Sequence, residues 1–420
     1  MHYAVYSGVF ITIDAALGKT ISILFFNLSP RPLEGLFVYR HLEYVRCNIA
    51  SMKTNHILLS ILLTIFLSCS DDASNSEEVV TFERDLGNGK LAVKQTGDGG
   101  YIVAGGTSDA WLLKMDKYGN TEWENTYSLG AFGNGRAVIQ TQDGGYLYAG
   151  WEGIVKADAN GTEEWKNTSH QNGAYPYYED VMQHSNGFYY AVGGPGAGQA
   201  QLVKFSETGS VLTRKWYGGQ CEDDIFRSIV ETPDEMLLIV GGKSHGNQSF
   251  PCSFNFMYYK DVWIVKTRKN GGVEWEKTHG GPYMEMANDI APIKSGGYML
   301  IGNKCAHLYD IGSCGQKAKV LIMQIDEEGN NLNDEVVSGL KWMERIPYYS
   351  IATTNDGYAW TAEHKNNGTW IYETTPNADP SYIFTDGFGG FEINHTTDGG
   401  FIIGTMGGIV IKTDSELFYD

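Results

Sequence analysis

The sequence has little proline, little charge and few basic side chains. Only 11 prolines and 19% charged residues occur among 420 positions, a composition that argues against disorder. Lys and Arg together number 31 against 50 Asp and Glu, which gives a formal net charge of -19. Nucleic-acid binding depends on cationic side chains that neutralise phosphates. The charge therefore argues against DNA, RNA and anionic lipid headgroups as main partners.

Common catalytic motifs are also absent. The chain has no Gly-x-Ser-x-Gly elbow, no Walker loop, no His-Glu-x-x-His and no dinucleotide fingerprint, and we identify no catalytic residue. No repeated segment carries the 3.6-residue apolar stripe of a helix, which excludes a helical solenoid. Glycine, by contrast, is abundant at 52 residues, and 13% of the chain is aromatic. This combination is typical of an all-β protein with many tight turns.

Residues 52–69 have the layout of a secretory signal. A short basic start at Met52 and Lys53 precedes an apolar run over residues 57–67. As a helix this run is about 16 Å long, half of a hydrocarbon core, so a spanning helix is the weaker interpretation. Residues 66–69 resemble the lipobox of bacterial lipoproteins, which implies lipidation of Cys69. The acidic residues that follow resemble those of Bacteroidota lipoproteins, which implies the outer membrane or the cell surface.

Three further boundaries follow from this signal. Residues 1–51 show no repeat and no steady hydrophobic period, so we interpret them as a mis-assigned upstream extension, with translation starting at Met52. A long translated extension is the alternative. Residues 70–79 are polar and acidic and predict a flexible tether. Residues 80–420 remain as the folded domain.

One short motif recurs along this domain. Its first two copies, Asp-Gly-Gly-Tyr followed by apolar residues and Gly, are shifted by 45 residues. The seven copies cover residues 98–105, 143–150, 186–193, 234–241, 296–302, 356–360 and 398–404. Asp-Gly supplies a hairpin turn between two strands, and a third strand then leads through Asp-x-x-Gly into a fourth. Four short strands per repeat indicate the blade of a propeller.

The chain ends complement each other. Residues 81–86 match the fourth strand of a repeat, whereas the last repeat ends after a third strand at residues 409–413. We expect the N-terminal strand to complete the last blade, because this pairing removes an open sheet edge. The sequence thus predicts an all-β, seven-bladed β-propeller of four-stranded antiparallel blades, with six or eight blades as the range.

The full repeat carries a family resemblance. Asp-Gly-Gly-Tyr followed by Trp-Leu-Leu-Lys-Met-Asp-x-x-Gly-Asn-x-x-Trp resembles the repeat propellers of uncharacterised bacterial secreted proteins, over residues 81–413. The Asp-x-x-Gly-x-x-x-Trp element is also similar to the tryptophan-docking repeat of pyrroloquinoline-quinone enzymes. Its Asp-to-Gly spacing is three rather than four, and no adjacent cysteine pair is present. The resemblance therefore implies the fold and no cofactor.

Tryptophan recurs in the fourth strand of three repeats, at Trp123, Trp165 and Trp275. Because a residue repeated at one blade position commonly packs between blades, we expect these three side chains to be structural. Unrepeated aromatic residues are better ligand candidates. Those that we select are Phe254, Phe256, Tyr258, Tyr259 and Tyr309.

These aromatic residues lie in two long insertions, residues 243–260 and 303–319. Both insertions join the second and third strands of a blade, on the face opposite the Asp-Gly turns. Long irregular loops on a rigid scaffold often carry binding residues. We therefore expect the insertion-bearing face to bind a partner.

Four cysteines follow Cys69, an even number in an exported chain. We predict that Cys221 pairs with Cys252 and Cys305 with Cys314, because the members of each pair lie on the same face. Free thiols are the alternative. A Cys/His metal site is the weaker hypothesis, since the spacings match no common zinc knuckle.

Acidic residues recur where the predicted blades begin. The candidates are Glu179, Asp180, Asp223, Asp224 and Asp289. Together they would ring the channel mouth and supply oxygen ligands from several blades to Ca²⁺. We favour the alternative, in which they are solvated surface charge or hydrogen-bond partners at the starts of strands.

These features lead to a functional hypothesis. We expect a lipid-anchored, monomeric propeller that binds a protein or glycan partner at the cell envelope. The alternative is an envelope glycan hydrolase or lyase with acidic residues at the channel mouth. A structural subunit of an envelope complex is a third hypothesis.

Overall fold

The structure is a computed structural model that divides into two compact units, Met1–Glu77 and Glu78–Asp420. The described residues are 6–13, 20–28, 41–48, 79–87, 89–106, 109–129, 135–168, 177–194, 198–219, 224–244, 260–281, 284–305, 318–337, 350–354, 357–363, 369–374, 381–385, 390–415 and 417. Among them, no helix is long and apolar enough to cross a membrane. Cys69 and the predicted signal lie outside this set.

The first unit contains one antiparallel sheet of three strands. These are β1 (Tyr6–Ile13), β2 (Thr20–Leu28) and β3 (His41–Asn48), and β2 lies in the middle. These strands are not predicted from the sequence, because residues 1–51 show no steady hydrophobic period. Translation from Met52 stays a prediction, since a sheet in this segment does not test where translation begins.

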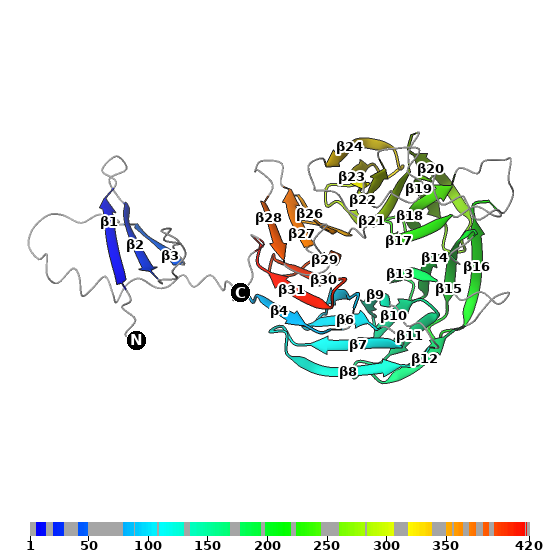
Figure 1. Ribbon diagram of the computed structural model, residues 1–420, viewed down its shortest axis with the longest axis horizontal. Coiled ribbons are helices and arrows are strands. Elements are labelled where there is room, and N and C mark those ends of the chain that lie inside the picture. Colours follow the sequence, from blue (N-terminus) through cyan, green and yellow to red (C-terminus); the bar gives the residue numbers. More distant parts are fainter. Residues whose placement is uncertain are drawn as a thin grey trace, which may run out of the picture. The chain divides into compact units, whose positions relative to one another are not determined.

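The second unit is a ring of seven four-stranded antiparallel sheets around a common axis (Figure 1). The strands of blades 1 to 4 are β5 (Ala92–Gln95), β6 (Tyr101–Gly105), β7 (Ala110–Met115), β8 (Thr121–Tyr127), β9 (Gly135–Gln140), β10 (Tyr146–Gly150), β11 (Gly153–Ala157), β12 (Glu163–Asn167), β13 (Tyr178–Gln183), β14 (Tyr189–Gly193), β15 (Ala200–Phe205), β16 (Val211–Tyr217), β17 (Ile225–Glu231), β18 (Leu237–Ser244), β19 (Lys260–Thr267) and β20 (Val273–His279). The strands of blades 5 to 7 are β21 (Glu285–Pro292), β22 (Tyr298–Cys305), β23 (Ala318–Ile325), β24 (Asn331–Val337), β25 (Ser350–Thr353), β26 (Tyr358–Glu363), β27 (Thr369–Thr374), β28 (Ser381–Thr385), β29 (Gly390–His395), β30 (Phe401–Thr405), β31 (Ile409–Thr413) and β4 (Phe82–Asp85).

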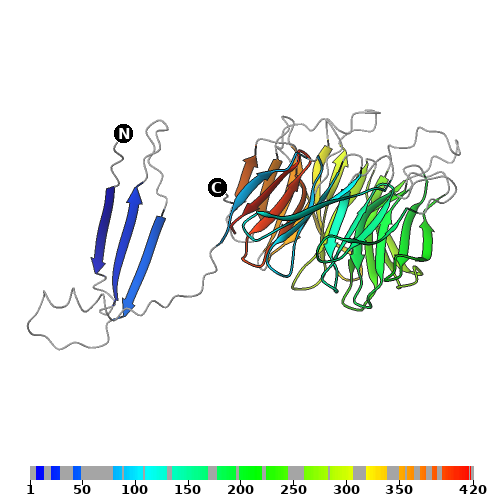
Figure 2. The ribbon, with the colours of Figure 1, turned by 90° about the horizontal axis from the view of Figure 1, so that it is seen from below.

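The last blade joins the two ends of the propeller. Strand β4 pairs antiparallel with β31, with Ile409 opposite Asp85 and Lys412 opposite Phe82. This pairing confirms the predicted closure, and it leaves blade 7 with the same four-stranded sheet as the others. In the side view the strands of the blades run between the two faces of the ring (Figure 2).

The repeated Asp of the hairpin turn binds a buried lysine from the third strand. Lys156 is 1% exposed at its side chain, and its Nζ lies 3.0 Å from Asp143 and 2.7 Å from Glu164. Lys114, Lys266 and Lys412 make the corresponding pairs with Asp98, Asp234 and Asp398. Asp143 also accepts the Gly145 N–H at 3.0 Å. The recurring motif is therefore explained by turn formation.

The repeated tryptophans pack against the next blade, as predicted. A Cβ added to Gly161 would lie 2.7 Å from the Trp123 ring, and one added to Gly209 would lie 2.3 Å from Trp165. Both glycines have a positive φ, +79° and +77°, which L-residues resist. Because the turn glycine has no Cβ, the indole of the neighbouring blade can pack against it, so this glycine has a structural role.

Candidate functional site

The innermost strands of five blades contain a β-bulge at the same blade position. The pairing register skips Arg136, Glu179, Arg227, Asn288 and Phe391, in β9, β13, β17, β21 and β29 respectively. Successive side chains of a regular strand point to opposite faces. A bulge inserts one extra residue and re-aims a side chain. Two consecutive residues of one strand can then face the channel.

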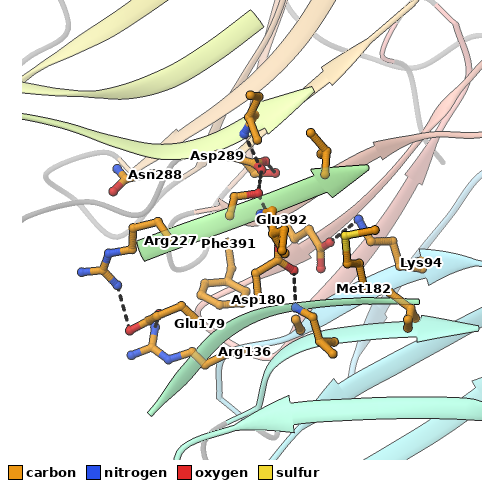
Figure 3. Close-up of a pocket in the computed structure, with 18 of the residues that line it drawn as sticks. Lys94, Arg136, Glu179, Asp180, Met182, Arg227, Asn288, Asp289, Phe391 and Glu392 are labelled. Carbon is orange, nitrogen blue, oxygen red and sulfur yellow. Dashed lines mark hydrogen bonds and ion pairs between the residues drawn. The ribbon is translucent and has the colours of Figure 1, made fainter. Parts of the chain in front are cut away.

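The bulges surround a cavity of about 330 Å³ in the central channel (Figure 3). All seven innermost strands contribute residues to its lining. In all five bulged strands both the bulged residue and the next residue line the cavity. These pairs are Arg136 and Ala137, Glu179 and Asp180, Arg227 and Ser228, Asn288 and Asp289, and Phe391 and Glu392. The channel therefore has two adjacent rings of side chains.

Strand direction decides on which side of the ring this site lies. Each innermost strand starts at the face that also carries the connections between second and third strands, because a blade runs up and down in chain order. Glu179 is the second residue of β13, and Asn288 lies in the first half of β21. The bulged residues are therefore nearer the face to which the insertions at residues 243–260 and 303–319 belong.

Carboxylates of the inner ring bind the backbone of the next blade. Asp180 Oδ2 accepts the Ile229 N–H at 2.9 Å, across the gap from blade 3 to blade 4. Asp289 Oδ2 likewise accepts the Ile351 N–H at 3.0 Å. These N–H groups belong to innermost strands, which have no further strand on the channel side. The carboxylates thus stabilise the contact between neighbouring blades.

Blade 7 makes the corresponding contact with blade 1. Glu392 Oε2 accepts the Val93 N–H at 2.9 Å, and its Oε1 lies 2.7 Å from Lys94 Nζ. Burial acts to lower the pKa of Lys94, but the Glu392 charge outweighs it and raises this pKa above its usual value. Lys94 therefore stays protonated within the channel.

Asp180 and Asp289 share a single serine. Ser228 Oγ lies 3.0 Å from Asp180 Oδ2 and 3.0 Å from Asp289 Oδ1, and its one hydrogen serves one of them at a time. Burial raises the pKa of Asp180 to about 7, and the Asp289 charge adds to the rise, against the lowering by the Ile229 N–H and Lys94. Near neutral pH this carboxyl is therefore partly protonated.

The outer ring is cationic around one carboxylate. Glu179 lies 2.9 Å from Arg227 Nη1 and 3.6 Å from Arg136 Nη1. Burial acts to raise the pKa of Glu179, but the two guanidinium groups outweigh it and lower this pKa. The Arg136 guanidinium also lies over the Trp151 ring, 5.0 Å from its centroid. Both arginines were missed in the sequence analysis.

The other predicted site residues divide into two groups. Asp224 is buried away from the cavity, where its carboxylate accepts the Ser244 N–H at 2.7 Å and the Gly219 N–H at 3.0 Å. Those outside the described residues are Asp223, Phe254, Phe256, Tyr258, Tyr259 and Tyr309. Their role in binding stays a prediction.

The cysteines are placed only in part. Cys305, the last residue of β22, is disulfide-bonded. Cys221, Cys252 and Cys314 lie outside the described residues. The pairings Cys221 with Cys252 and Cys305 with Cys314 therefore stay predictions.

The donor set at the channel does not favour Ca²⁺. Among the described residues there is no group of three or more His, Cys, Asp or Glu that could hold a metal ion. Asp289 accepts hydrogen bonds from Ser228, Ser350 and two backbone N–H groups. Its oxygens are thus already occupied by donors, and Asp223 is the acidic candidate that the structure does not place.

Comparisons with known proteins identify the fold class. No family model matches this chain, and no curated protein matches it. A streptogramin B lyase structure is similar with a TM-score of 0.54 and 13% identity, over 79% of this chain and 97% of the other. The WD40 β-propeller domain of Doa1 is similar with a TM-score of 0.51 and 13% identity, over 79% and 95%. At this identity the likeness shows a β-propeller and nothing about function.

Proposed function

We propose that this protein is a surface-anchored bacterial lipoprotein whose propeller binds a protein or glycan partner through its insertion-bearing face. The observation that carries this proposal is the division of features between the two faces. The repeated Asp, Lys, Gly and Trp residues are used in turns and in packing between blades. The two insertions, which do not repeat, join strands at the other face, and the charged cavity lies nearer that face.

The contacts favour a binding protein over the alternative, an envelope glycan hydrolase or lyase. Two glycosidase carboxylates stand about 5–10 Å apart and exchange protons with the substrate. Asp180 and Asp289 are close enough, since both touch Ser228. However, each also accepts backbone N–H groups that join two blades. These contacts give both carboxylates a structural role between blades.

A pull-down from native envelopes tests the proposal. Wild-type protein is compared with a variant in which residues 245–259 and 306–317 are each replaced by a short Gly-Ser linker. We expect the wild type to retain a partner protein, or a glycan on an array, that this variant loses. The matched control is Arg268→Gln, an exposed change on the turn-bearing face. A partner retained equally by the loop variant would contradict the proposal, and turnover of envelope glycans would favour the enzyme.

A further inference from the structure

The channel cavity separates charge along its axis. Its outer ring contains two guanidinium groups, from Arg136 and Arg227, around the single carboxylate of Glu179. One residue deeper, the inner ring contains the carboxylates of Asp180, Asp289 and Glu392. Glu179 and Asp180 are consecutive residues of β13, whereas Arg136 and Arg227 belong to β9 and β17, and Figure 3 shows both arginines beside Glu179. A cationic end and an anionic end thus face one small space.

Two carboxylates of the anionic end, those of Asp180 and Asp289, form no ion pair with a Lys or Arg among the described residues. Their hydrogen-bond donors are the Ser228 and Ser350 hydroxyls and backbone N–H groups, which carry no charge. Lys94 pairs with Glu392. A primary ammonium group carries three donors and a positive charge, so it would balance the charge of these carboxylates.

Arg227 is the most exposed of the three charged side chains in the outer ring. The Arg227 side chain is 17% exposed, whereas Glu179 is 9% and Arg136 2% exposed. A guanidinium presents a planar set of N–H donors that matches a carboxylate. Arg227 is therefore the group in this ring that a ligand carboxylate can reach.

The walls between the two ends are partly apolar. Ile139, Met182 and Phe391 line the cavity beside the charged groups. A volume of about 330 Å³ lies at the lower end of the range of small-molecule sites. The space suits a molecule with few heavy atoms, and its lining residues, among those that the structure describes, all lie in strands.

We propose that the central cavity binds a small zwitterion, with its primary ammonium between Asp180 and Asp289 and its carboxylate against Arg227. The ligand class is an amino acid or a similar compound with one charge of each sign. The residues that would hold it belong to the innermost strands, so this inference does not depend on the proposed function. The bulges create it, because they bring both charged rings to the channel.

Calorimetry with compounds of graded length tests the site. The probes are glycine, β-alanine and γ-aminobutyrate, which hold one ammonium and one carboxylate at increasing separation. Butylamine and butyrate are the controls with a single charge. We expect at least one amino acid to bind about tenfold more tightly than both controls. If no probe binds with a Kd below ~10 mM, the proposal is wrong. It is also wrong if a control compound binds as tightly as every amino acid.

Substitutions at Arg227 test the cationic end of the cavity by itself. Arg227→Gln should weaken the binding of the amino acid about tenfold, to the level of butylamine, while the affinity for butylamine stays unchanged. Arg227→Lys keeps the charge without the planar fork and should give an intermediate affinity, which also provides a reading if the Gln variant does not fold. The control is Arg268→Gln, which should bind like the wild type. Unchanged amino-acid affinity in both Arg227 variants would overturn the proposal.

The loop-replaced variant distinguishes this inference from the proposed function. It should lose the partner protein or glycan and still bind the amino acid, because the innermost strands remain intact. Loss of the amino acid together with the partner, in a variant that melts like the wild type, would place the zwitterion on the loops and overturn the inference.

Discussion

At the scale of single residues, acidic side chains have opposite roles in different parts of a blade. Asp98 in a hairpin turn has its pKa lowered to about 2, where Thr96, Lys114 and the Gly100 N–H outweigh the effect of partial burial. Asp180 in the channel has its pKa raised to about 7. Burial is the main cause of the rise at Asp180, and the Asp289 charge adds to it, whereas the turn supplies a lysine to the less buried Asp98.

These pKa values predict two windows of pH dependence. Asp98 contributes stability above its ordinary pKa of about 4, and this contribution is lost as pH falls through about 2. For Asp180 the sign is reversed. Its protonated form favours the fold below pH 4, and this contribution, a few kcal/mol at most, is lost as pH rises through about 7.

The Asp180 prediction is tested with Asp180→Asn. This side chain cannot ionise, so the variant should show a smaller loss of stability between about pH 4 and pH 7 than the wild type. The measurement is urea unfolding at a series of pH values. Glu83→Gln, at an exposed position of β4, is the control. Equal pH slopes for the Asp180 variant and the wild type would contradict the assigned role.

At the scale of elements, neighbouring blades are joined through glycines in their turns. The Trp165 side chain packs on Gly209 and donates its Nε1–H to the Glu207 carbonyl at 2.8 Å. Asn167 Nδ2 donates to the Gly209 carbonyl, also at 2.8 Å. Strand β12 of one blade is thereby held to the turn between β15 and β16 of the next.

We expect Gly209→Ala to destabilise the propeller by about 2–4 kcal/mol. The substitution puts an alanine at a φ of +77° and a Cβ 2.3 Å from the Trp165 ring, so strain and overpacking act together. The measurement is the free energy of unfolding in urea.

Gly97→Ala is the matched control for this change. Its Cβ would meet only Gln140 Oε1, at an ordinary 3.5 Å, and Gly97 has no positive φ. We therefore expect a change within about 0.5 kcal/mol. A Gly209 variant as stable as this control would show that the indole can move aside at no cost.

At the scale of the whole molecule, closure of the ring sets the environment of the channel. Strand β4 completes the sheet of β29 to β31, and Glu392 of β29 then reaches the Val93 N–H of β5. The first and last blades are thus joined both at the outer strand and at the channel. All seven innermost strands can therefore line one cavity.

The proposed anchor also concerns the whole molecule. If Cys69 is lipidated, Cys69→Ala should move the protein from the membrane fraction to the soluble fraction, because the lipid chains supply the membrane affinity. Fractionation and immunoblotting measure this change, and Ser70→Ala is the neighbouring control. A Cys69→Ala protein that still sediments with membranes would contradict lipid anchoring.

Peptides from residues 1–51 in the native protein would contradict translation from Met52.

The sequence by itself determined the architecture of this protein. Asp-Gly and Asp-x-x-Gly turns, or close variants of them, recur along the propeller, and turn chemistry is local, so the seven repeats and the closing strand could be predicted. The first unit could not, because no comparable signal marks β1 to β3. Glu179, Asp180 and Asp289 were predicted at the channel, but their partners were not.

Only the tertiary structure decided what the channel contains. A bulge shifts the register by one residue, and it turns Arg136 and Arg227 toward the cavity without any distinctive motif. The bulged residues lie at a constant offset before the hairpin turns, so an alignment of the repeats would place them in one column. The contacts themselves join residues about 50 positions apart, such as Asp180 and Ile229. Such partners meet because the ring closes, and sequence spacing does not encode that proximity.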